Sequence, residues 1–250
     1  MKISIISVVL NNKDFIEDCI NSVLSQTYNN IEYIIIDGGS TDGTVDIIRK
    51  YGNKIARWVS EPDRGIYDAM NKGIRMATGD VVGLLNADDV YANDRVIEKV
   101  SESISNKSAE SCYGDIVYVD ALDAGKVRRF WHSGPYHKKR FFQGWMPPHP
   151  AFFVRRRAYE KYGFFNLALG TAADYELMLR FLVKHKITTY YIPEVLVKMR
   201  MGGQSNASLK KRLTANRMDR KAWAVNGMQP NPWTLLMKPL SKVKQYFFTA

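Results

Sequence analysis

The chain has 250 residues, of which 46% are hydrophobic, 24% charged and 12% aromatic. This length and composition are typical of a globular protein with one large domain or two small ones, and they exclude a disordered, collagen-like or disulfide-rich chain. The formal net charge of +11 is unevenly placed, since residues 1–197 hold 25 basic and 24 acidic side chains whereas residues 198–250 hold 11 and 1. A basic segment of this kind attracts polyanions such as nucleic acid or an anionic membrane surface.

The first 90 residues alternate short apolar runs with runs of helical periodicity. The apolar runs predict strands at residues 3–10, 32–36, 56–60 and 80–85. Apolar side chains at helical spacing predict helices at residues 15–24, 45–48 and 64–77. Four strands separated by three helices favour a parallel sheet that is covered by helices and joined by right-handed crossovers.

The alternation is weaker beyond residue 110. We expect strands at residues 111–120, 127–131, 151–154, 188–192 and 195–201, an aromatic loop at residues 141–150 and a helix at residues 173–186. Cys19 and Cys112 lie far apart, without the Cys and His spacing that zinc needs, so we interpret both as thiols of the core. The first apolar run is too short to span a bilayer and lacks a cleavage site, so we expect no secretory or transmembrane segment.

The basic C-terminal segment has helical character. One stripe of a helix would carry Trp233, Leu236, Met237, Leu240, Val243 and Phe247, with Lys238 and Lys242 on the opposite side and a kink at Pro239. Such a stripe either packs on its own domain or lies on an anionic lipid surface. Both interpretations stay open from the sequence.

Polar loops follow the first four predicted strands. They lie at residues 11–12, 37–42, 61–64 and 86–89, and three of them carry carboxylates. Ligands of an open parallel sheet bind at the carboxyl ends of its strands, so we expect these loops to form one site. The turn after the first strand has no glycine and the chain has no GxxxxGK[ST] sequence, which argues against dinucleotide enzymes and P-loop nucleotidases.

Acidic residues in two of these loops have a functional and a structural interpretation. Asp88 and Asp89 follow a buried strand, where adjacent carboxylates favour a hard divalent cation. Alternatively one of them, Asp89 in particular, caps the following helix. Asp37 either accepts hydrogen bonds from a nucleobase or ribose, or belongs to a tight turn in which Ser40 or Thr41 is the cap.

Four segments together resemble family 2 glycosyltransferases. They are DGGSTDGT at 37–44, EPDRGIYDAMNKG at 61–73, ATGD at 77–80 and LNADD at 85–89, preceded by the strand IISVV at 5–9 and by Asn11. The resemblance extends from residue 3 to about residue 200 and is strongest over the first 95 residues. It indicates the bacterial enzymes that build capsule, O-antigen or colanic-acid-type surface polysaccharide.

The resemblance implies an α/β GT-A fold with a Rossmann-like, mostly parallel central sheet flanked by helices. Residues 1–200 would form the glycosyltransferase domain, with a nucleotide-sugar-binding half at 1–110 and an acceptor-binding half at 111–200. Residues 201–250 would form a basic helical C-terminal extension.

The resemblance also implies roles for individual residues of the first half. Mn²⁺ or Mg²⁺ would bind to Asp88 and Asp89, although Asn86 stands where the family's metal motif begins with an acid. The nucleotide sugar would contact Ser7, Asn11, Asp37, Gly39, Asp63, Gly65, Asn71, Asn86, Ala87 and Asp88.

The second half would supply the catalytic base and the acceptor side. The resemblance implies Asp174 as the base, preceded by Ala173 where many relatives have an acid; from the residues alone, Asp174 also fits a helix N-cap. The acceptor cleft and a closing lid would involve Trp145, His149, Arg200, Gly203 and Ser205. A packed tryptophan, a structural histidine and a plain linker are the alternatives.

These roles predict an inverting transfer from a nucleotide sugar, with UDP the expected nucleotide, to a hydroxyl of a lipid-linked or other glycan acceptor in surface polysaccharide biosynthesis. We expect a cytoplasmic enzyme that contacts the anionic inner face of the cell membrane through its basic segment and binds no nucleic acid. The oligomeric state stays open. The competing hypothesis is a non-catalytic α/β module that binds nucleic acid or a partner through the basic segment.

Overall fold

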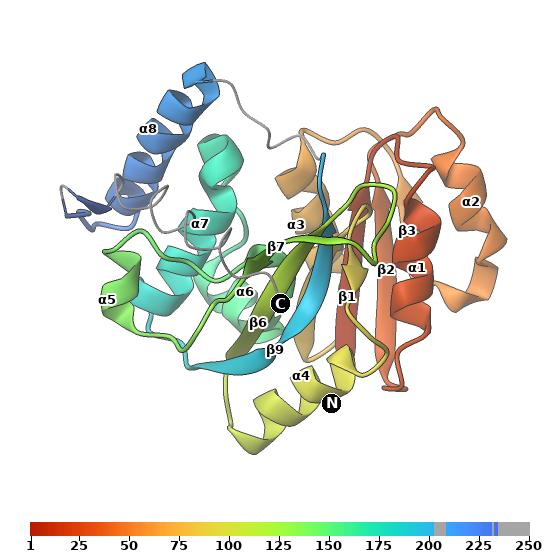
Figure 1. Cartoon of the computed structure of the whole chain (residues 1–250), viewed down its shortest axis with the longest axis horizontal. Coiled ribbons are helices and arrows are strands. Elements are labelled where there is room, and N and C mark those ends of the chain that lie inside the picture. Colours follow the sequence, from red (N-terminus) through yellow and green to blue (C-terminus); the bar gives the residue numbers. More distant parts are fainter. Residues whose placement is uncertain (203–208, 232, 235–250) are drawn as a thin grey trace.

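A mixed sheet of nine strands forms the middle of the protein (Figure 1). The structure is a computed structural model, and it describes residues 1–202, 209–231 and 233–234. The first half of the sheet is parallel, with the strand order β3 (Arg57–Ser60), β2 (Ile31–Asp37), β1 (Ile3–Val9) and β4 (Val81–Asn86). These strands are connected through α1 (Ile16–Leu24), α2 (Thr44–Lys50), the short η1 (Gly52–Lys54) and α3 (Ile66–Met76).

The second half of the sheet is mixed. From β4 it continues through antiparallel β8 (Phe152–Arg155) to β6 (Ser111–Val119), and then through parallel β9 (Thr189–Arg200) to the short β5 (Val90–Tyr91). The strand β7 (Val127–Trp131) forms a hairpin with β6. The helical elements of this half are α4 (Val96–Asn106), α5 (Lys138–Phe141), η2 (His149–Ala151), α6 (Arg156–Tyr162), η3 (Leu167–Ala172), α7 (Ala173–Met178), the π-helical η4 (Leu179–Lys184) and α8 (Leu209–Val225).

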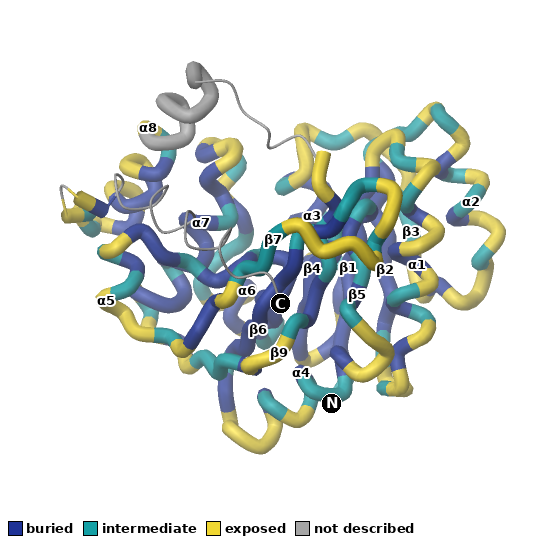
Figure 2. Tube along the Cα trace, viewed as in Figure 1, coloured by how far each residue is buried: buried dark blue, intermediate teal, exposed yellow. Residues whose placement is uncertain are grey.

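Alternating side chains of the strands build an apolar core on each face of the sheet. Ile6 and Val82 belong to the core that α3 and α7 cover, whereas Ile5 and Val81 belong to the core that α1 and α4 cover. Figure 2 shows the central strands β1, β4 and β6 buried between helices whose outer surfaces are exposed. The result is the helix–sheet–helix layering of an α/β fold, as expected.

The elements predicted for the first half are confirmed, with their ends shifted by at most two residues. In the second half, the two closing strands predicted at 188–192 and 195–201 are one strand, β9. Its register with β6 is irregular where Pro193 lies, and such an irregularity tolerates a residue without a backbone N–H. The helix α6 and the bounds of α4 were not predicted, although Val96, Val100 and Ile104 repeat at helical spacing and are buried.

Other expectations concern caps and cysteines. Neither Asp88 nor Asp89 caps a helix, because α4 begins only at Val96 and has Arg95 at its N-cap. Cys19 and Cys112 are buried and free, as expected of core thiols. Burial raises the pKa of Cys19 to about 12.

Part of the C-terminal extension packs on the domain. Trp223 of α8 is fully buried, its indole Nε1 donates a hydrogen bond of 2.9 Å to the Tyr175 hydroxyl, and its ring lies 4.8 Å from that of Phe142. Of the predicted apolar stripe only Trp233 is described, and it is 70% exposed; the other members lie outside the described residues. No helix in the described part of the chain is long and apolar enough to cross a membrane.

Candidate active site

The carboxyl ends of the parallel strands meet at one edge of the sheet. Asp37, the last residue of β2, lies beside Val9 of β1 and Ser60 of β3 in the strand register. Asn86, the last residue of β4, lies beside Val8 of β1. The four polar loops therefore start from neighbouring positions, as expected.

Hydrogen bonds tie the first two loops together. The backbone N–H of Asn11 donates to Ser40 Oγ at 2.7 Å, and Asn11 Oδ1 accepts from the backbone N–H of Thr41 at 2.8 Å. Asn11 has a φ of +48°, a conformation that asparagine adopts more readily than most residues. The side chain of Asn11 thus shapes the edge of the site. Neither Ser40 nor Thr41 caps α2, whose N-cap is Gly43.

Asp37 is fully buried, and its two carboxylate oxygens differ in their hydrogen bonding. Its Oδ2 accepts hydrogen bonds from the backbone N–H groups of Gly39 and Ser40 and from Ser60 Oγ, at 3.1, 2.9 and 2.6 Å. Its Oδ1 has no hydrogen-bond partner among the residues that the structure describes. One oxygen of Asp37 thus holds the turn, and the other leaves the interpretation as a ligand contact open.

Asp63, in the third loop, likewise has one carboxylate oxygen with a partner and one without. Its Oδ1 lies 2.6 Å from Lys72 Nζ of α3, and its Oδ2 has no hydrogen-bond partner in the described part of the chain. A Cβ at Gly38 would lie 3.3 Å from that Oδ2, so glycine keeps the second and third loops close together. Gly39 and Gly65 have φ values of +86° and +114°, which favour glycine on both sides of this carboxylate.

The fourth loop has two more buried acceptors. Asn86 Nδ2 donates to Asp89 Oδ2 at 3.1 Å, while Oδ1 of each residue lacks a hydrogen-bond partner within the described ranges. Burial raises the pKa of Asp88. Burial, and then the charge of Asp88, raise the pKa of Asp89 well above its ordinary value. A cation beside this loop would offset the cost of keeping both carboxylates charged.

The residues of this loop fit a divalent cation that a substrate helps to bind. Within the described residues, no group of three His, Cys, Asp or Glu side chains could hold a metal by itself. Mg²⁺, however, usually binds through one or two carboxylates and takes its other oxygen ligands from phosphates and water. Asp88 and the unpaired oxygens of Asn86 and Asp89 are oxygen donors of that kind.

Asp174 is the second residue of α7, in the other half of the protein. It is not the N-cap, a position that Ala172 occupies. Its side chain is 19% exposed, and its Oδ2 lies 3.8 Å from His149 Nδ1. Burial, and then the negative charge of Asp174, raise the pKa of Tyr67 of α3. The predicted base is thus partly exposed and lies within electrostatic range of α3.

His149 lies within electrostatic range of the predicted base, Asp174, and of Asp88 in the predicted metal loop. Burial lowers its pKa, although the negative charges of Asp174 and Asp88 both act to raise it. The charges of the predicted base and of the predicted metal loop therefore both act on His149, and burial favours its neutral form. Neutral imidazole can donate one hydrogen bond and accept another.

Arg200, at the end of β9, is buried and held by three residues. It forms an ion pair with Asp18 of α1, donates a hydrogen bond of 3.0 Å to the Ala121 carbonyl, and lies over the ring of Phe15 at 4.7 Å. Its positive charge acts to lower the pKa of Asp88. Arg200 thus lies near the metal loop. The predicted lid residues Gly203 and Ser205 lie outside the described residues.

Four of the predicted site residues are packed or hydrogen-bonded within the fold and do not face the loops at the strand ends. Ser7 lies in the core below α1, where its hydroxyl accepts a hydrogen bond of 3.0 Å from Tyr33. Ala87 is buried, and both amide atoms of Asn71 bond to the backbone of Phe165.

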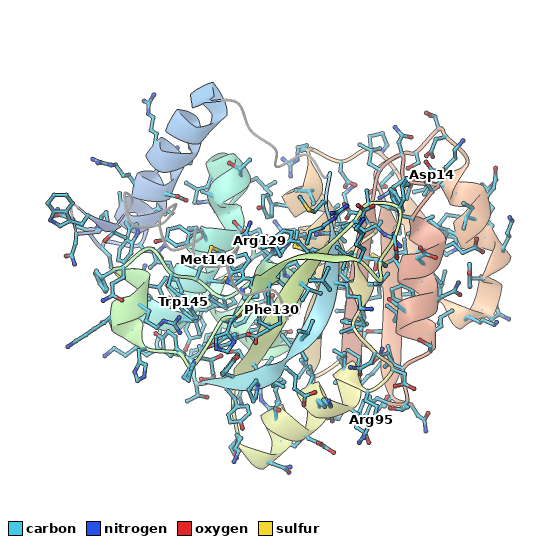
Figure 3. The ribbon with its side chains drawn as sticks, viewed as in Figure 1. Asp14, Arg95, Arg129, Phe130, Trp145 and Met146 are labelled. Carbon is cyan, nitrogen blue, oxygen red and sulfur yellow. The ribbon has the colours of Figure 1, made fainter. Side chains whose placement is uncertain are left out.

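Trp145 is the fourth of these residues, and Figure 3 shows it on the α5 side of the sheet. It is 9% exposed, its indole Nε1 donates a hydrogen bond of 2.9 Å to the Ser133 carbonyl, and its ring packs edge-on against Tyr113 and Phe141. The structure thus matches the packed alternative for this tryptophan.

Three residues of the site were not predicted: Ser60, Tyr67 and Lys72. Tyr67 and Lys72 belong to the segment at 61–73 and lie five positions apart on α3. Tyr67 lies within electrostatic range of Asp174, and Lys72 forms an ion pair with Asp63. Ser60 ends β3 and bonds to Asp37. Only the position of Ser60 at a predicted strand end could have pointed to it.

Comparison with known sequences now decides the family. The model of "Glycosyl transferase family 2" matches residues 4–163. A glycosyltransferase of Mycobacterium tuberculosis is 34% identical over 180 residues, which are 71% of this chain and 68% of that relative. The chain belongs to glycosyl transferase family 2. A Mycobacterium bovis protein named "PGL/p-HBAD biosynthesis glycosyltransferase" is 29% identical over 213 residues, 83% of this glycosyltransferase and 80% of that protein.

Solved structures agree with this glycosyltransferase in fold. TarS from S. aureus, in complex with UDP-GlcNAc, aligns with a TM-score of 0.71 and 17% identity over 95% of this chain and 69% of that structure. The mannosyltransferase PcManGT from Pyrobaculum calidifontis, in complex with GDP-Man and Mn²⁺, aligns with a TM-score of 0.66 and 17% identity over 95% and 68%. The predicted GT-A fold class is therefore confirmed.

Proposed function

We propose that this glycosyltransferase transfers a sugar, with inversion, from a UDP-sugar to a hydroxyl of a glycan acceptor. One observation carries the proposal. Four buried acceptor oxygens without a hydrogen-bond partner in the described residues lie in three neighbouring loops: Asp37 Oδ1, Asp63 Oδ2, Asn86 Oδ1 and Asp89 Oδ1. Buried acceptors are costly unless a donor or a cation reaches them, and a nucleotide sugar brings N–H and O–H donors.

The nucleotide is proposed to bind between the second and third loops. Asp37 Oδ1 and Asp63 Oδ2 are carboxylate oxygens, which accept from the N–H of a base and from ribose hydroxyls. The TarS complex holds UDP-GlcNAc, whereas the PcManGT complex holds GDP-Man. Comparing sugar donors that carry different nucleotides therefore tests the UDP assignment directly.

The diphosphate is proposed to lie beside Asn86–Asp89. Asp88 would hold Mn²⁺ or Mg²⁺ with Asp89, and the bound cation would supply Lewis-acid stabilisation to the diphosphate. The PcManGT complex contains Mn²⁺, which supports a metal in this fold. Arg200 contributes positive charge near the same loop.

Asp174 is proposed as the general base. Its carboxylate would accept the proton of the acceptor hydroxyl while the hydroxyl oxygen bonds to the anomeric carbon and the nucleoside diphosphate leaves. A single displacement of this kind inverts the configuration at that carbon. A well-placed base contributes roughly 10²–10⁴-fold to such a step. His149 lies 3.8 Å from Asp174, and burial favours its neutral form, which can form a hydrogen bond with the acceptor without adding charge.

The acceptor is proposed to be a lipid-linked glycan, met at the inner face of the cell membrane. Support comes from the exposed basic side chains of α8, Arg217, Arg220 and Lys221, and from Trp233, which is 70% exposed. Lysine and arginine near an anionic lipid surface contribute about 1 kcal/mol each, and tryptophan favours the interface. We propose no nucleic-acid partner, because the acidic strand ends serve a different ligand.

A donor panel tests the enzyme class and the donor together. The full chain is incubated with Mn²⁺ and, separately, UDP-, GDP- and dTDP-sugars, and released nucleoside diphosphate is measured. Release from UDP-sugars alone is expected. Equal release from GDP- or dTDP-sugars would overturn the UDP assignment. If no nucleotide sugar reacts and no nucleoside diphosphate raises the melting temperature, the enzyme proposal fails.

Two variants then separate the proposed roles. Asp174→Asn should lower kcat by about 10²-fold or more while leaving UDP affinity within about twofold, because only the base is lost. Asp88→Ala should weaken Mn²⁺-dependent UDP binding in calorimetry. Asp46→Asn, on the exposed face of α2, serves as the control and should change neither quantity. Full turnover by Asp174→Asn would place the base elsewhere.

A further inference from the structure

The C-terminal extension is bonded to both of the residues that directly follow the proposed base. Trp223 of α8 donates a hydrogen bond of 2.9 Å from its indole Nε1 to the Tyr175 hydroxyl. Asn226, directly after α8, donates one of 2.9 Å from its Nδ2 to Glu176 Oε1. All four residues are buried. The extension therefore holds the first turn of α7 from its buried side.

Tyr175 also bonds to the base itself. Its backbone N–H donates to Asp174 Oδ1 at 2.7 Å, while Asp174 Oδ2 lies 3.8 Å from His149 Nδ1. The ring of Tyr175 is stacked on that of Phe141, with 6.2 Å between the ring centres. Tyr175 thus contacts the base through its backbone and α8 through its hydroxyl. Two successive hydrogen bonds lead from Trp223 to the carboxylate of the base.

The second attachment holds Glu176, which is part of a larger network. The Glu176 carboxylate forms an ion pair of 2.9 Å with Arg180 Nε, and Arg180 also donates to the Phe164 carbonyl at 2.6 Å. The side-chain amide of Asn226 has two N–H donors, and it bonds to Glu176 and to the Ala222 carbonyl, each at 2.9 Å. Carbonyls in the last turn of a helix have no partner within the helix, and Ala222 is in the last turn of α8. Asn226 therefore joins the end of α8 to α7.

A membrane contact alone does not require these bonds. The exposed basic residues Arg217, Arg220 and Lys221 lie on α8, and such charges attract anionic lipid however their helix is attached. The buried hydrogen bonds, by contrast, are directional, and they fix where the first turn of α7 lies relative to α8. The turn that they fix is the one that carries the proposed base.

We propose that Trp223 and Asn226 are positioning residues, through which the C-terminal extension holds Asp174 in its catalytic position. The proposal rests on the proposed function, in which Asp174 is the base. It makes the extension part of the catalytic unit, in addition to a site of membrane contact. Misplacing a catalytic group by about 1 Å can cost about 10²-fold in rate, so even a small shift of this turn matters.

Two variants of the full chain remove these bonds. Asn226→Ala removes the amide, and Trp223→Phe removes the indole N–H but keeps an aromatic ring beside Phe142. The assay follows UDP release from the UDP-sugar selected by the donor panel, with Mn²⁺ and without lipid or glycan. Water is then the acceptor: its oxygen bonds to the anomeric carbon, UDP leaves, and a proton of the water passes to Asp174. We expect release per UDP-binding site, counted by calorimetry, to fall about tenfold in both variants, with UDP affinity within about twofold.

Thr234→Val is the matched control. It removes a buried hydroxyl of the same extension, which donates a hydrogen bond of 2.6 Å to the Phe142 carbonyl, on the loop after α5. Its UDP release per UDP-binding site should equal that of the unmodified protein. Counting UDP-binding sites removes unfolded molecules from the comparison, so a loss of stability alone does not lower the measured rate. A role limited to membrane contact predicts no loss in any of the three variants, because the assay contains no lipid.

Hydrogen exchange at the backbone N–H of Tyr175 tests the attachment without any need for activity. This N–H bonds to Asp174 Oδ1, and local opening of the turn exposes it to exchange. Its exchange, relative to that of Ile6 in β1, should be about tenfold faster in Asn226→Ala and Trp223→Phe. In Thr234→Val it should be unchanged.

Three results would overturn the proposal. The first is equal UDP release per UDP-binding site in Asn226→Ala, Trp223→Phe and Thr234→Val. The second is an undiminished further loss when Asn226→Ala is added to Asp174→Asn, since residues that act through one another are not additive. The third is unchanged exchange at Tyr175, which counts against the attachment even in a protein that releases no UDP. Absence of UDP release from the unmodified protein is instead a failure of the proposed function.

Discussion

Glu32 and Asp37 are buried carboxylates at opposite ends of β2, and their hydrogen bonds separate a structural role from a functional one. Glu32 accepts hydrogen bonds from Ser4 Oγ, from the backbone N–H and Oγ1 of Thr78, and from Lys2 Nζ, at 2.6, 2.7, 2.7 and 3.0 Å. Asp37 leaves one oxygen without a partner in the described residues. The satisfied carboxylate joins strands at the edge remote from the site, and the unsatisfied one is available to a ligand.

Stability should depend on Glu32 in a pH-dependent way. Burial would raise its pKa, but the hydrogen bonds from Ser4, Thr78 and Lys2 outweigh burial and lower the pKa from 4.5 to about 2. The stabilisation is therefore complete above pH 4.5 and disappears as the pH falls towards 2. Glu32→Gln should cost about 2 kcal/mol at pH 7 in urea unfolding and much less near pH 3.

The control for Glu32→Gln is Asp46→Asn, which alters a surface pair with Arg49 whose side chains are 73% and 63% exposed. That change should cost less than about 0.5 kcal/mol at either pH. An equal loss at pH 7 and pH 3 for Glu32→Gln would contradict the prediction, because it would mean that the charge of Glu32 is not what stabilises the fold.

Residue types and strand ends were enough to predict which polar residues lie at one edge of the sheet. Asp37, Asp63, Asn86 and Asp88 each follow a predicted strand, and chain order places such residues together. The burial of Ser7 and of Trp145 could not be predicted, because a residue's face on a strand and its packing depend on neighbours that are distant in sequence. Tyr67 was not singled out for the same reason, since Asp174, whose charge acts on it, lies in the other half of the chain.

At the scale of elements, α3 is the helix whose position matters most. Gly73 lies on its inner face, where a Cβ would come 2.3 Å from Ile6 Cγ2 of β1 and 3.3 Å from Ile36 Cγ1 of β2. Glycine therefore lets α3 approach the sheet closely, although glycine is a poor helix former. The helical pattern at 64–77 predicted α3, but it could not show how near the sheet the helix lies.

Gly73→Ala should destabilise the protein in spite of the better helix propensity of alanine. The added methyl group would push α3 away from β1 or strain Ile6, at a cost of about 1–3 kcal/mol. Thermal unfolding should show a lower Tm, and kcat should fall with it because Asn71, which bonds to Phe165 just before η3, moves with the helix. Ser105→Ala, on the exposed side of α4, is the control. A higher Tm for Gly73→Ala would show that the sheet yields easily at this point.

At the scale of the whole molecule, the basic segment divides into a packed part and an exposed part. Asn226 donates a hydrogen bond of 2.9 Å to Glu176 of α7, and Thr234 Oγ1 donates one of 2.6 Å to the Phe142 carbonyl. The charge count located the basic segment, and a helix was expected there. The charge count could not show which residues face the core, because a helix with charges on several sides has no single apolar face.

Trp223 and Trp233 form a natural pair for separating packing from membrane contact. Trp223→Ala should destabilise the fold by about 3–5 kcal/mol, because it empties a fully buried site. Trp233→Ala should leave Tm unchanged and reduce co-sedimentation with vesicles that contain phosphatidylglycerol, but not with vesicles of phosphatidylcholine alone. Unchanged sedimentation would remove the support that Trp233 gives to the proposed membrane contact.

The two hydrogen bonds between Asn71 and Phe165 span 94 residues. A chain growing from the ribosome has therefore made β1 to β4, with all four unpaired oxygens, long before η3 and α7 exist. At that stage it carries the donor loops but neither Asp174 nor the segment that attaches Asp174 to α3. If Asp174 is the base, as proposed, a chain that has made only the first half has the loops proposed to bind the donor and still lacks the residue proposed to catalyse the transfer.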